Sequence, residues 1–230
     1  MRSATAVMAL ALCFTACAAP TALPPPGPPA VITGTVKSVK GRPLDGLVLL
    51  ERGELHGNVW DGGTLLKDGT FRVEVAAGGQ YGLHVYASGY FYRPQAIRVE
   101  AGQTLTVDIL LAPEPMRTRD PVIRRAGFGA DRQRPVTRVS LEVTDPDNNL
   151  GPQVMAFDAK AGRAYAMSPP IPMRDLKANF PPGEYRLEVN TSAGPADPRD
   201  WYFVVADHAC FTSDILSFPH TPRPPQVVRE

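Results

Sequence analysis

Cysteine is scarce in this 230-residue chain, which contains Cys13, Cys17 and Cys210 and no others. Cys13 lies inside an apolar N-terminal run that we expect to be removed, and Cys17 follows that run as a candidate for lipid modification. Cys210 would then be the one remaining thiol. An intramolecular disulfide framework is therefore excluded in the processed protein.

Sequence signatures of the common enzyme classes are also missing. The chain has no His-Glu-x-x-His, no Gly-x-Ser-x-Gly, no Gly-x-x-x-x-Gly-Lys-Ser/Thr and no Cys-x-x-Cys. Its histidines, at positions 56, 84, 208 and 220, are too scattered to form a metal-ligand set by local spacing. We therefore expect a protein that is not an enzyme.

A strong excess of either charge is absent. Lys and Arg total 24 and Asp and Glu total 23, and removal of an N-terminal segment containing Arg2 would make the chain formally neutral. This balance argues against a nucleic-acid partner. Arginines gather between residues 117 and 134, where they would contact phosphate-rich lipid or polysaccharide, or form a solvated, screened linker.

No stretch has a sustained helical stripe, and the 25 prolines would interrupt one. Short runs rich in β-branched and aromatic residues appear instead, and Phe71, Val73 and Val75 alternate with charged residues as in a strand solvated on one face. The fold class predicted is all-β, as two tandem antiparallel β-sandwiches of the prealbumin or immunoglobulin type. The clearest strand candidates are residues 31–36, 47–50, 71–75, 81–85, 97–111, 136–143, 153–157, 163–167 and 201–205.

The N-terminus is typical of an export signal. A positive Arg2 precedes the apolar run Ala6 to Phe14, which is shorter than the roughly 20 residues that a membrane-spanning helix needs. Phe14-Thr15-Ala16-Cys17 resembles the bacterial lipobox, which implies a signal peptide over residues 1–16 and a lipid on Cys17. We expect a lipid-anchored protein of the outer membrane or periplasm. The alternative is ordinary cleavage beside Ala16, giving a soluble periplasmic or secreted product.

Residues 17–30 form a Pro-rich segment that predicts an extended tether. The segment that follows, residues 31–113, contains a series of turn and strand motifs in a set order. Their order and spacing resemble the carboxypeptidase regulatory-like, transthyretin-like domain family. That resemblance implies a β-sandwich that accompanies enzymes without being one. The motifs are Gly34-Thr35-Val36, Gly41 to Val48, Asp68-Gly69-Thr70-Phe71, Gly79 to Val85 and Ser88-Gly89-Tyr90.

Two details within residues 31–113 lead to separate expectations. Residues 51–66 depart from the family pattern and are expected to form a long inserted loop, including a turn at Trp60-Asp61-Gly62-Gly63. Tyr81 follows a turn and starts a strand, so its ring should be buried while its hydroxyl reaches nearby backbone.

The remainder of the chain divides in three. Residues 114–135 are predicted to form a basic linker, residues 136–210 a second β-sandwich, and residues 211–230 a Pro-rich tail. The segment Gly183 to Val189 repeats the Gly-x-Tyr-x-Leu-x-Val pattern found from Gly79 to Val85. The repetition favours a second sandwich built on the same turn and tyrosine.

A run of aromatic residues is the first candidate ligand site. Tyr86, Tyr90, Phe91 and Tyr92 lie close to a predicted loop, and exposed rings stack on sugar faces. The resemblance also extends to a superfamily with starch-binding-like sandwiches, which implies carbohydrate as the ligand. Burial of some of these rings in the core is the alternative.

Two weaker patterns suggest metal ions, although no cofactor is expected overall. Asp145, Asp147 and Asn149 group short oxygen ligands that suit calcium, and the same residue types are also selected by any tight turn. His208, Cys210 and His220 would suit copper or zinc. For Cys210 the alternatives are a small buried apolar residue or an intermolecular disulfide.

Three hypotheses about function follow. The first is a non-catalytic envelope lipoprotein that acts as a binding or scaffold module and presents loops to a glycan or an envelope protein. The second is an accessory subunit of an envelope transport or assembly complex. The third is a periplasmic metal-handling protein.

Overall fold

A computed structural model places most of the chain, and the all-β prediction is confirmed. One short 3-10 helix, η3 (Pro198–Asp200), is the only helix among the described residues, and none of their helices is long and apolar enough to cross a bilayer. The described residues are 27–53, 60–91, 93–114, 120–130, 134–146, 150–168, 182–190, 197–207, 210 and 212–217; side chains of 151–153 are not described.

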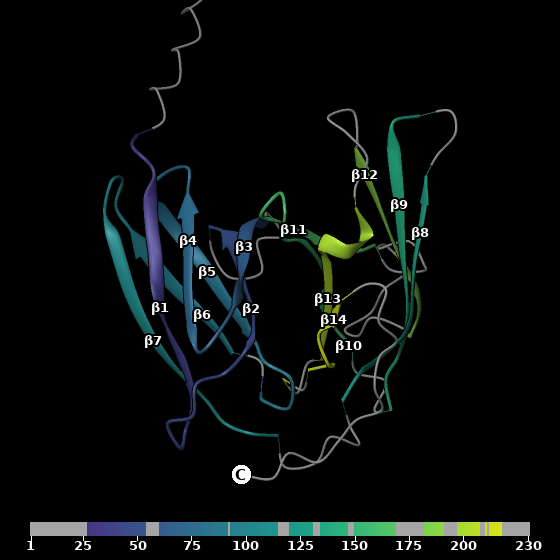
Figure 1. Cartoon of the computed structure of the whole chain (residues 1–230), viewed down its shortest axis with the longest axis horizontal. Helices are drawn as coiled ribbons and strands as arrows, with labels where there is room; N and C mark the ends of the chain where they lie inside the picture. Colours follow the sequence, from purple (N-terminus) through teal and green to yellow (C-terminus); the bar gives the residue numbers. More distant parts are fainter. Residues whose placement is uncertain are drawn as a thin grey trace, which may run out of the picture.

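The first sandwich consists of a three-stranded and a four-stranded sheet (Figure 1). One sheet has the order β4-β1-β7, where β1 lies antiparallel to β4 and parallel to β7. That parallel pair departs from the antiparallel arrangement expected from the sequence. The second sheet has the order β3-β2-β5-β6 and is antiparallel throughout. The strands are β1 (Ala30–Ser38), β2 (Gly46–Arg52), β3 (Trp60–Leu66), β4 (Thr70–Val75), β5 (Gly79–Tyr86), β6 (Arg93–Val99) and β7 (Thr104–Leu111).

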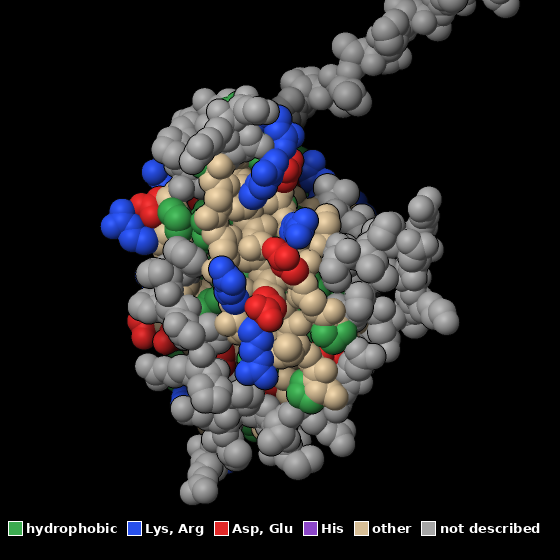
Figure 2. All heavy atoms as spheres, turned by 90° about the vertical axis from the view of Figure 1, so that its right-hand side faces the viewer, with side chains coloured by type: hydrophobic (Ala, Val, Ile, Leu, Met, Phe, Trp, Pro, Cys, Tyr) green, Lys and Arg blue, Asp and Glu red, His purple; other side chains and the backbone are tan. Residues whose placement is uncertain are grey.

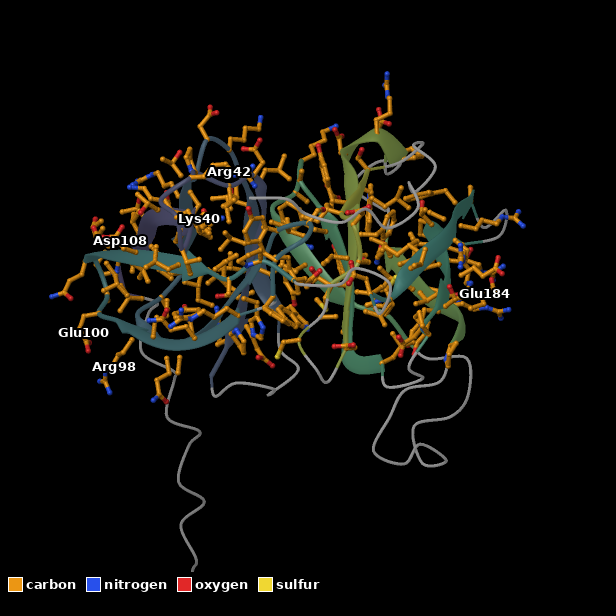
Figure 3. All side chains as sticks on the ribbon, turned by 90° about the horizontal axis from the view of Figure 1, so that it is seen from below. Lys40, Arg42, Arg98, Glu100, Asp108 and Glu184 are labelled. Carbon is orange, nitrogen blue, oxygen red and sulfur yellow. The ribbon has the colours of Figure 1, made fainter. Side chains whose placement is uncertain are left out.

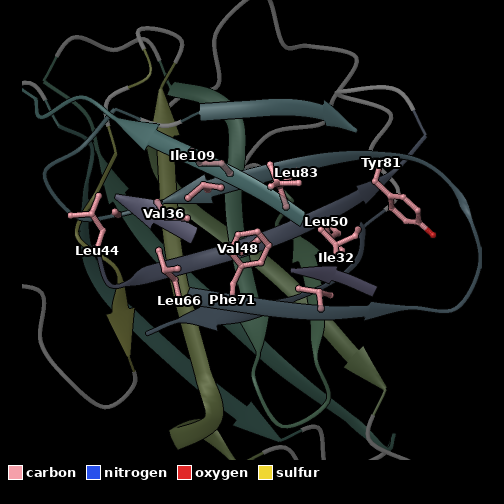
Figure 4. Close-up of a cluster of buried hydrophobic side chains, with 14 of the residues drawn as sticks. Ile32, Val36, Leu44, Val48, Leu50, Leu66, Phe71, Tyr81, Leu83 and Ile109 are labelled. Carbon is pink, nitrogen blue, oxygen red and sulfur yellow. The ribbon is translucent and has the colours of Figure 1, made fainter. Parts of the chain in front are cut away.

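The core of this sandwich forms where the inward faces of its sheets meet (Figure 4). Phe71, Val73 and Val75 on β4 are buried and the residues between them are exposed, as their alternation predicts. Tyr81 is buried and donates its hydroxyl to the Ala77 carbonyl at 2.7 Å, which confirms the expected tyrosine corner. Complete burial of one Val or Phe side chain in this core stabilises the folded state by about 1.5–3 kcal/mol.

The second sandwich also combines a three-stranded and a four-stranded sheet, with the orders β12-β9-β8 and β11-β10-β13-β14. Trp201 is fully buried at its centre, where Tyr165 stacks on it at 5.6 Å between ring centroids. Tyr185, the counterpart of Tyr81 in the repeated pattern, is also fully buried, and burial raises the pKa of its hydroxyl. The strands are β8 (Val122–Ala130), β9 (Val136–Thr144), β10 (Leu150–Asp158), β11 (Arg163–Ala166), β12 (Gly183–Asn190), β13 (Trp201–Asp207) and β14 (Leu216–Ser217).

A third apolar layer joins the sandwiches. The β2 run Leu47-Val48-Leu49-Leu50 is fully buried on both faces, because Val48 and Leu50 face the first core while Leu47 and Leu49 face the other way. Leu47 and Leu49 pack with Tyr86 of β5 and with residues of the sheet β11-β10-β13-β14, namely Met155, Phe157, Ala164, Val204 and Ala206. The four sheets therefore stack as consecutive layers with three apolar layers between them (Figure 1).

The outer sheet β12-β9-β8 is solvated on its far face. Figure 2 shows Lys or Arg and Asp or Glu side chains interspersed over this side of the molecule. Glu188 on β12 accepts hydrogen bonds from Arg138 on β9 at 3.0 Å and from Arg134 at 3.1 Å. Exposed pairs of this kind keep the surface polar and contribute little to stability.

The prediction of an inserted loop over residues 51–66 is wrong for the residues that the structure describes. Glu51 and Arg52 complete β2, and Trp60 to Leu66 form the edge strand β3, while residues 54–59 lie outside the described part of the chain. Gly62 and Gly63 were interpreted as a turn, yet they lie within β3. A side chain at Gly62 would approach the Gly162 carbonyl oxygen to 2.6 Å, so the glycine marks where the second sandwich comes close.

The predicted bounds of the linker and of the tail also differ from the structure. The range 114–135 contains β8, which pairs with β9 and buries Val122 and Ile123, so part of the expected linker belongs to the second sandwich. The range 211–230 contains β14, and Leu216 packs in the second core. Both segments contain apolar residues that become buried only when the sheets form. Their high content of arginine or proline made them resemble a linker and a tail in the sequence.

Candidate functional site

A groove of about 800 Å³ lies between one end of the first sandwich and the edge of the second. Its exposed lining residues are polar except for one proline: Arg42, Pro43, Asp45, Lys67, Asp68 and Ser88. Leucines at positions 44, 65 and 66 form its apolar floor, and Tyr202 and Ile215 supply the wall from the second sandwich.

Tight turns place the polar groups of the groove. The Asp68 N–H donates to Asp45 Oδ1 at 2.8 Å, which ties the turn after β3 to the loop before β2. Asp68 and Gly69 both have positive φ, at 49° and 68°, in the turn that joins β3 to β4. Asp tolerates the left-handed region better than most residues, and Gly adopts it without cost.

Arg42 is held against a ring rather than left mobile. Its guanidinium donates a hydrogen bond to the Tyr90 hydroxyl and lies 6.0 Å from the centroid of that ring. Both interactions reduce the rotamer freedom of the side chain, so its guanidinium is held in a restricted orientation. Figure 3 shows Arg42 well apart from Arg98 and Glu100.

The charges of the groove balance, because Arg42 and Lys67 are matched by Asp45 and Asp68. The site therefore offers hydrogen-bond donors and acceptors without a strong potential of either sign. A ring, Tyr202, lies half-buried among them. Such a set suits a neutral ligand with many hydroxyl groups, since each hydroxyl both donates and accepts.

The groove lies at the end of the first sandwich that is remote from Gly27, the first described residue. The Gly102 N–H donates to the Pro28 carbonyl, so the chain enters beside the β6–β7 turn. The loop before β2, the β3–β4 turn and the Ser88–Tyr90 loop are at the opposite end of the same strands. At about 3.3 Å per residue, strands of this length separate the ends by roughly 20 Å.

The predicted aromatic site is only partly at this groove. Tyr86 is fully buried in the layer between the sandwiches, and Tyr90 is 3% exposed but is among the residues that line the groove. Phe91 is half-buried, and Tyr92 lies outside the described residues. A ligand role for these aromatics stays a prediction.

Sequence reasoning missed most of the groove. Arg42, Asp45, Lys67 and Asp68 looked like ordinary turn residues, and Tyr202 looked like part of a closing strand. The signal available was the polar content of two turns at the same end of predicted neighbouring strands. Tyr202 could not be assigned to them, because it comes from the other sandwich.

The metal predictions fall mostly outside the described residues. Asp145 is nearly buried, whereas Asp147, Asn149, His208 and His220 are not described, and neither is Cys17. Within the described ranges, no three His, Cys, Asp or Glu side chains lie close enough together to hold a metal ion. Cys210 is half-buried, and burial, together with the negative charge of Asp207, raises the pKa of its thiol.

A buried ionisable pair lies in the layer between the sandwiches. Glu51 on β2 and His84 on β5 are 1% and 0% exposed, and Glu51 Oε2 lies 3.0 Å from His84 Nε2. The Trp60 ring covers the imidazole at 4.8 Å between centroids. The pair faces the second sandwich, away from the groove lining.

No protein-family profile and no curated protein matches the chain. Among solved structures, a DUF3823 family protein from Parabacteroides merdae is 15% identical, with a TM-score of 0.30, over 83% of this chain and 98% of that one. The major pilin subunit of Bacillus cereus is 8% identical, with a TM-score of 0.31, over 80% and 66%. The minor pilin of Streptococcus agalactiae is 20% identical, with a TM-score of 0.31, over 39% and 47%. Likenesses at this level carry no inference about function.

Proposed function

We propose that this protein is a non-catalytic binding module of the bacterial cell envelope, held to a membrane by a lipid on Cys17, which binds a neutral glycan in the groove. The observation that carries the proposal is the composition of the groove, where balanced charges and hydroxyl-compatible donors and acceptors surround the Tyr202 ring. Aromatic rings supply the apolar faces on which sugars stack, and the polar groups fix orientation.

The position of the groove supports the lipid anchor in the proposal. The N-terminal segment enters at the far end of the first sandwich, so an anchored molecule would present the groove away from the bilayer. The Pro-rich tether of residues 17–30 would add distance, because such segments are semi-rigid and extended.

Substitutions in the groove should weaken glycan binding. Tyr202→Leu, which keeps an apolar contact but removes the ring, and Arg42→Ala are each expected to reduce affinity about tenfold or more. The measurement is isothermal titration with maltoheptaose, cellohexaose and chitohexaose. Arg98→Ala, an exposed arginine remote from the groove, is the matched control and should bind as the unsubstituted protein does. Absence of binding to all three glycans would argue against the proposal.

The anchor is tested separately. Cys17→Ala should move the protein from the membrane to the soluble fraction of the producing cell, because the lipid is the proposed attachment. Fractionation with detection of the C-terminal part measures this, and Cys13→Ala is the control that should stay with the membrane. Continued membrane association of Cys17→Ala would contradict a lipid on that residue.

A further inference from the structure

A buried polar junction fastens the C-terminal segment to the first sandwich beside the groove. Glu114 and Thr212 are each at most 1% exposed. The neighbouring Ser213 is equally buried but is tied to β13 of its own sandwich, where its N–H donates to the Val205 carbonyl at 2.9 Å and its Oγ accepts from the Val205 N–H at 3.0 Å. Glu114 follows the last strand of the first sandwich, whereas Thr212 and Ser213 follow β13 of the second. The junction therefore joins segments 98 residues apart in the sequence.

The carboxylate of Glu114 is the centre of this junction. Its Oε1 accepts from the Thr212 N–H at 2.9 Å, and the Thr212 hydroxyl lies 3.2 Å from the same oxygen and 3.1 Å from the Tyr90 carbonyl oxygen. The single hydroxyl proton is thus shared between two acceptors. Hydrogen bonds to a charged acceptor are stronger than neutral ones, and burial of a carboxylate is costly without them.

The same segments form walls of the groove. The Glu114 N–H donates to the Gly89 carbonyl at 3.0 Å, which holds the Ser88–Tyr90 loop. The Ile215 N–H donates to Ser88 Oγ at 3.1 Å. Ser88, Tyr90 and Ile215 all line the groove, so the contacts that dock the C-terminal segment also position three of its lining residues.

We infer that Glu114 is a positioning residue for the ligand groove. Its buried carboxylate fastens residues 212–215 to the Ser88–Tyr90 loop, and the groove is complete only while this junction, the Glu114–Thr212 clasp, is intact. The effect on glycan affinity rests on the proposed function, whereas the clasp itself does not. Glu114 lies behind the wall and acts through Tyr90 and Ile215, without touching the ligand.

The reactivity of the Cys210 thiol can show whether the clasp is intact, because Cys210 is half-buried and precedes Thr212 by two residues. The full chain carrying Cys13→Ser and Cys17→Ser has Cys210 as its one thiol. Glu114→Ala should raise the rate of alkylation by monobromobimane about tenfold, since release of the segment exposes the thiol. Glu114→Gln, which keeps an oxygen acceptor for the Thr212 N–H, should restore most of the protection.

Two further variants make the result decisive. Glu184→Ala removes an exposed carboxylate on the outer sheet (Figure 3) and should leave the alkylation rate unchanged. Ser88→Ala removes the second tie and should raise the rate by a smaller factor, which covers the case in which Glu114→Ala does not fold. Unchanged rates in Ser88→Ala and in a folded Glu114→Ala would overturn the inference.

The glycan readout separates this inference from the proposed function. In titrations with maltoheptaose, cellohexaose and chitohexaose, Glu114→Ala should lose affinity and Glu114→Gln should recover it. If the unsubstituted protein binds none of the three, the proposed function fails, and the alkylation rates still decide the clasp. If Glu114→Ala exposes Cys210 but binds glycan with full affinity, the role of Glu114 in positioning the groove is wrong.

Discussion

Replacing Glu51 with alanine is expected to lower the free energy of unfolding by about 3–5 kcal/mol. Its carboxylate lies 3.0 Å from the His84 ring nitrogen in a layer where both side chains are at most 1% exposed. Removal of one partner leaves the other buried without that contact, which costs more than the pair contributes as a whole. Urea denaturation followed by tryptophan fluorescence measures the change.

A double substitution distinguishes pair formation from simple packing at this position. Glu51→Leu with His84→Leu should lose much less stability than the two single changes added together, because neither buried polar group is then left without the other. Glu100→Ala, which breaks an exposed ion pair with Arg98, is the control and should have little effect. A loss below about 1 kcal/mol for Glu51→Ala would show that water or another group replaces the contact easily.

The two sandwiches are expected to unfold in a single cooperative transition. Leu49, Tyr86, Phe157 and Val204 are at most 1% exposed in the layer between them, so separation would expose a contiguous apolar surface to water. Differential scanning calorimetry should then give equal calorimetric and van't Hoff enthalpies. Two resolved transitions in the unsubstituted protein would contradict this expectation.

A charged substitution in the joining layer should break the coupling. Phe157→Asp places a carboxylate among apolar side chains and is expected to split the single transition into two, because docking weakens while each core stays intact. Phe71→Ala removes a ring from the first core instead. It should lower the transition temperature, at a cost of about 3–5 kcal/mol, without such a clear separation.

Local pattern and turn chemistry predicted the strands well. Period-two alternation located β4 and β9, and the turn before Tyr81 predicted its buried ring and its backbone hydrogen bond. Errors arose where composition obscured the pattern: glycines in β3 looked like a turn, and arginines in β8 looked like a linker. In both strands the pairing partner was needed to reveal the structure.

The sequence contains one indication of the joining layer, which a search for alternating apolar residues does not detect. Leu47 to Leu50 is continuously apolar, which is typical of a strand buried on both faces. The chain gives no local indication of what covers the second face. The structure supplies that partner as the sheet that contains Phe157 and Val204.

The amino-acid sequence by itself determined the all-β class, the positions of most strands and the polar turns at one end of the first sandwich, because these depend on neighbours a few residues apart. Only the tertiary structure decided that the sandwiches share an apolar layer, and that Tyr202 and Ile215 line one groove together with Arg42 and Asp45. It alone also placed Glu114 beside Thr212. The physical reason is that these contacts join surfaces remote in sequence, and no local periodicity records which buried face meets which.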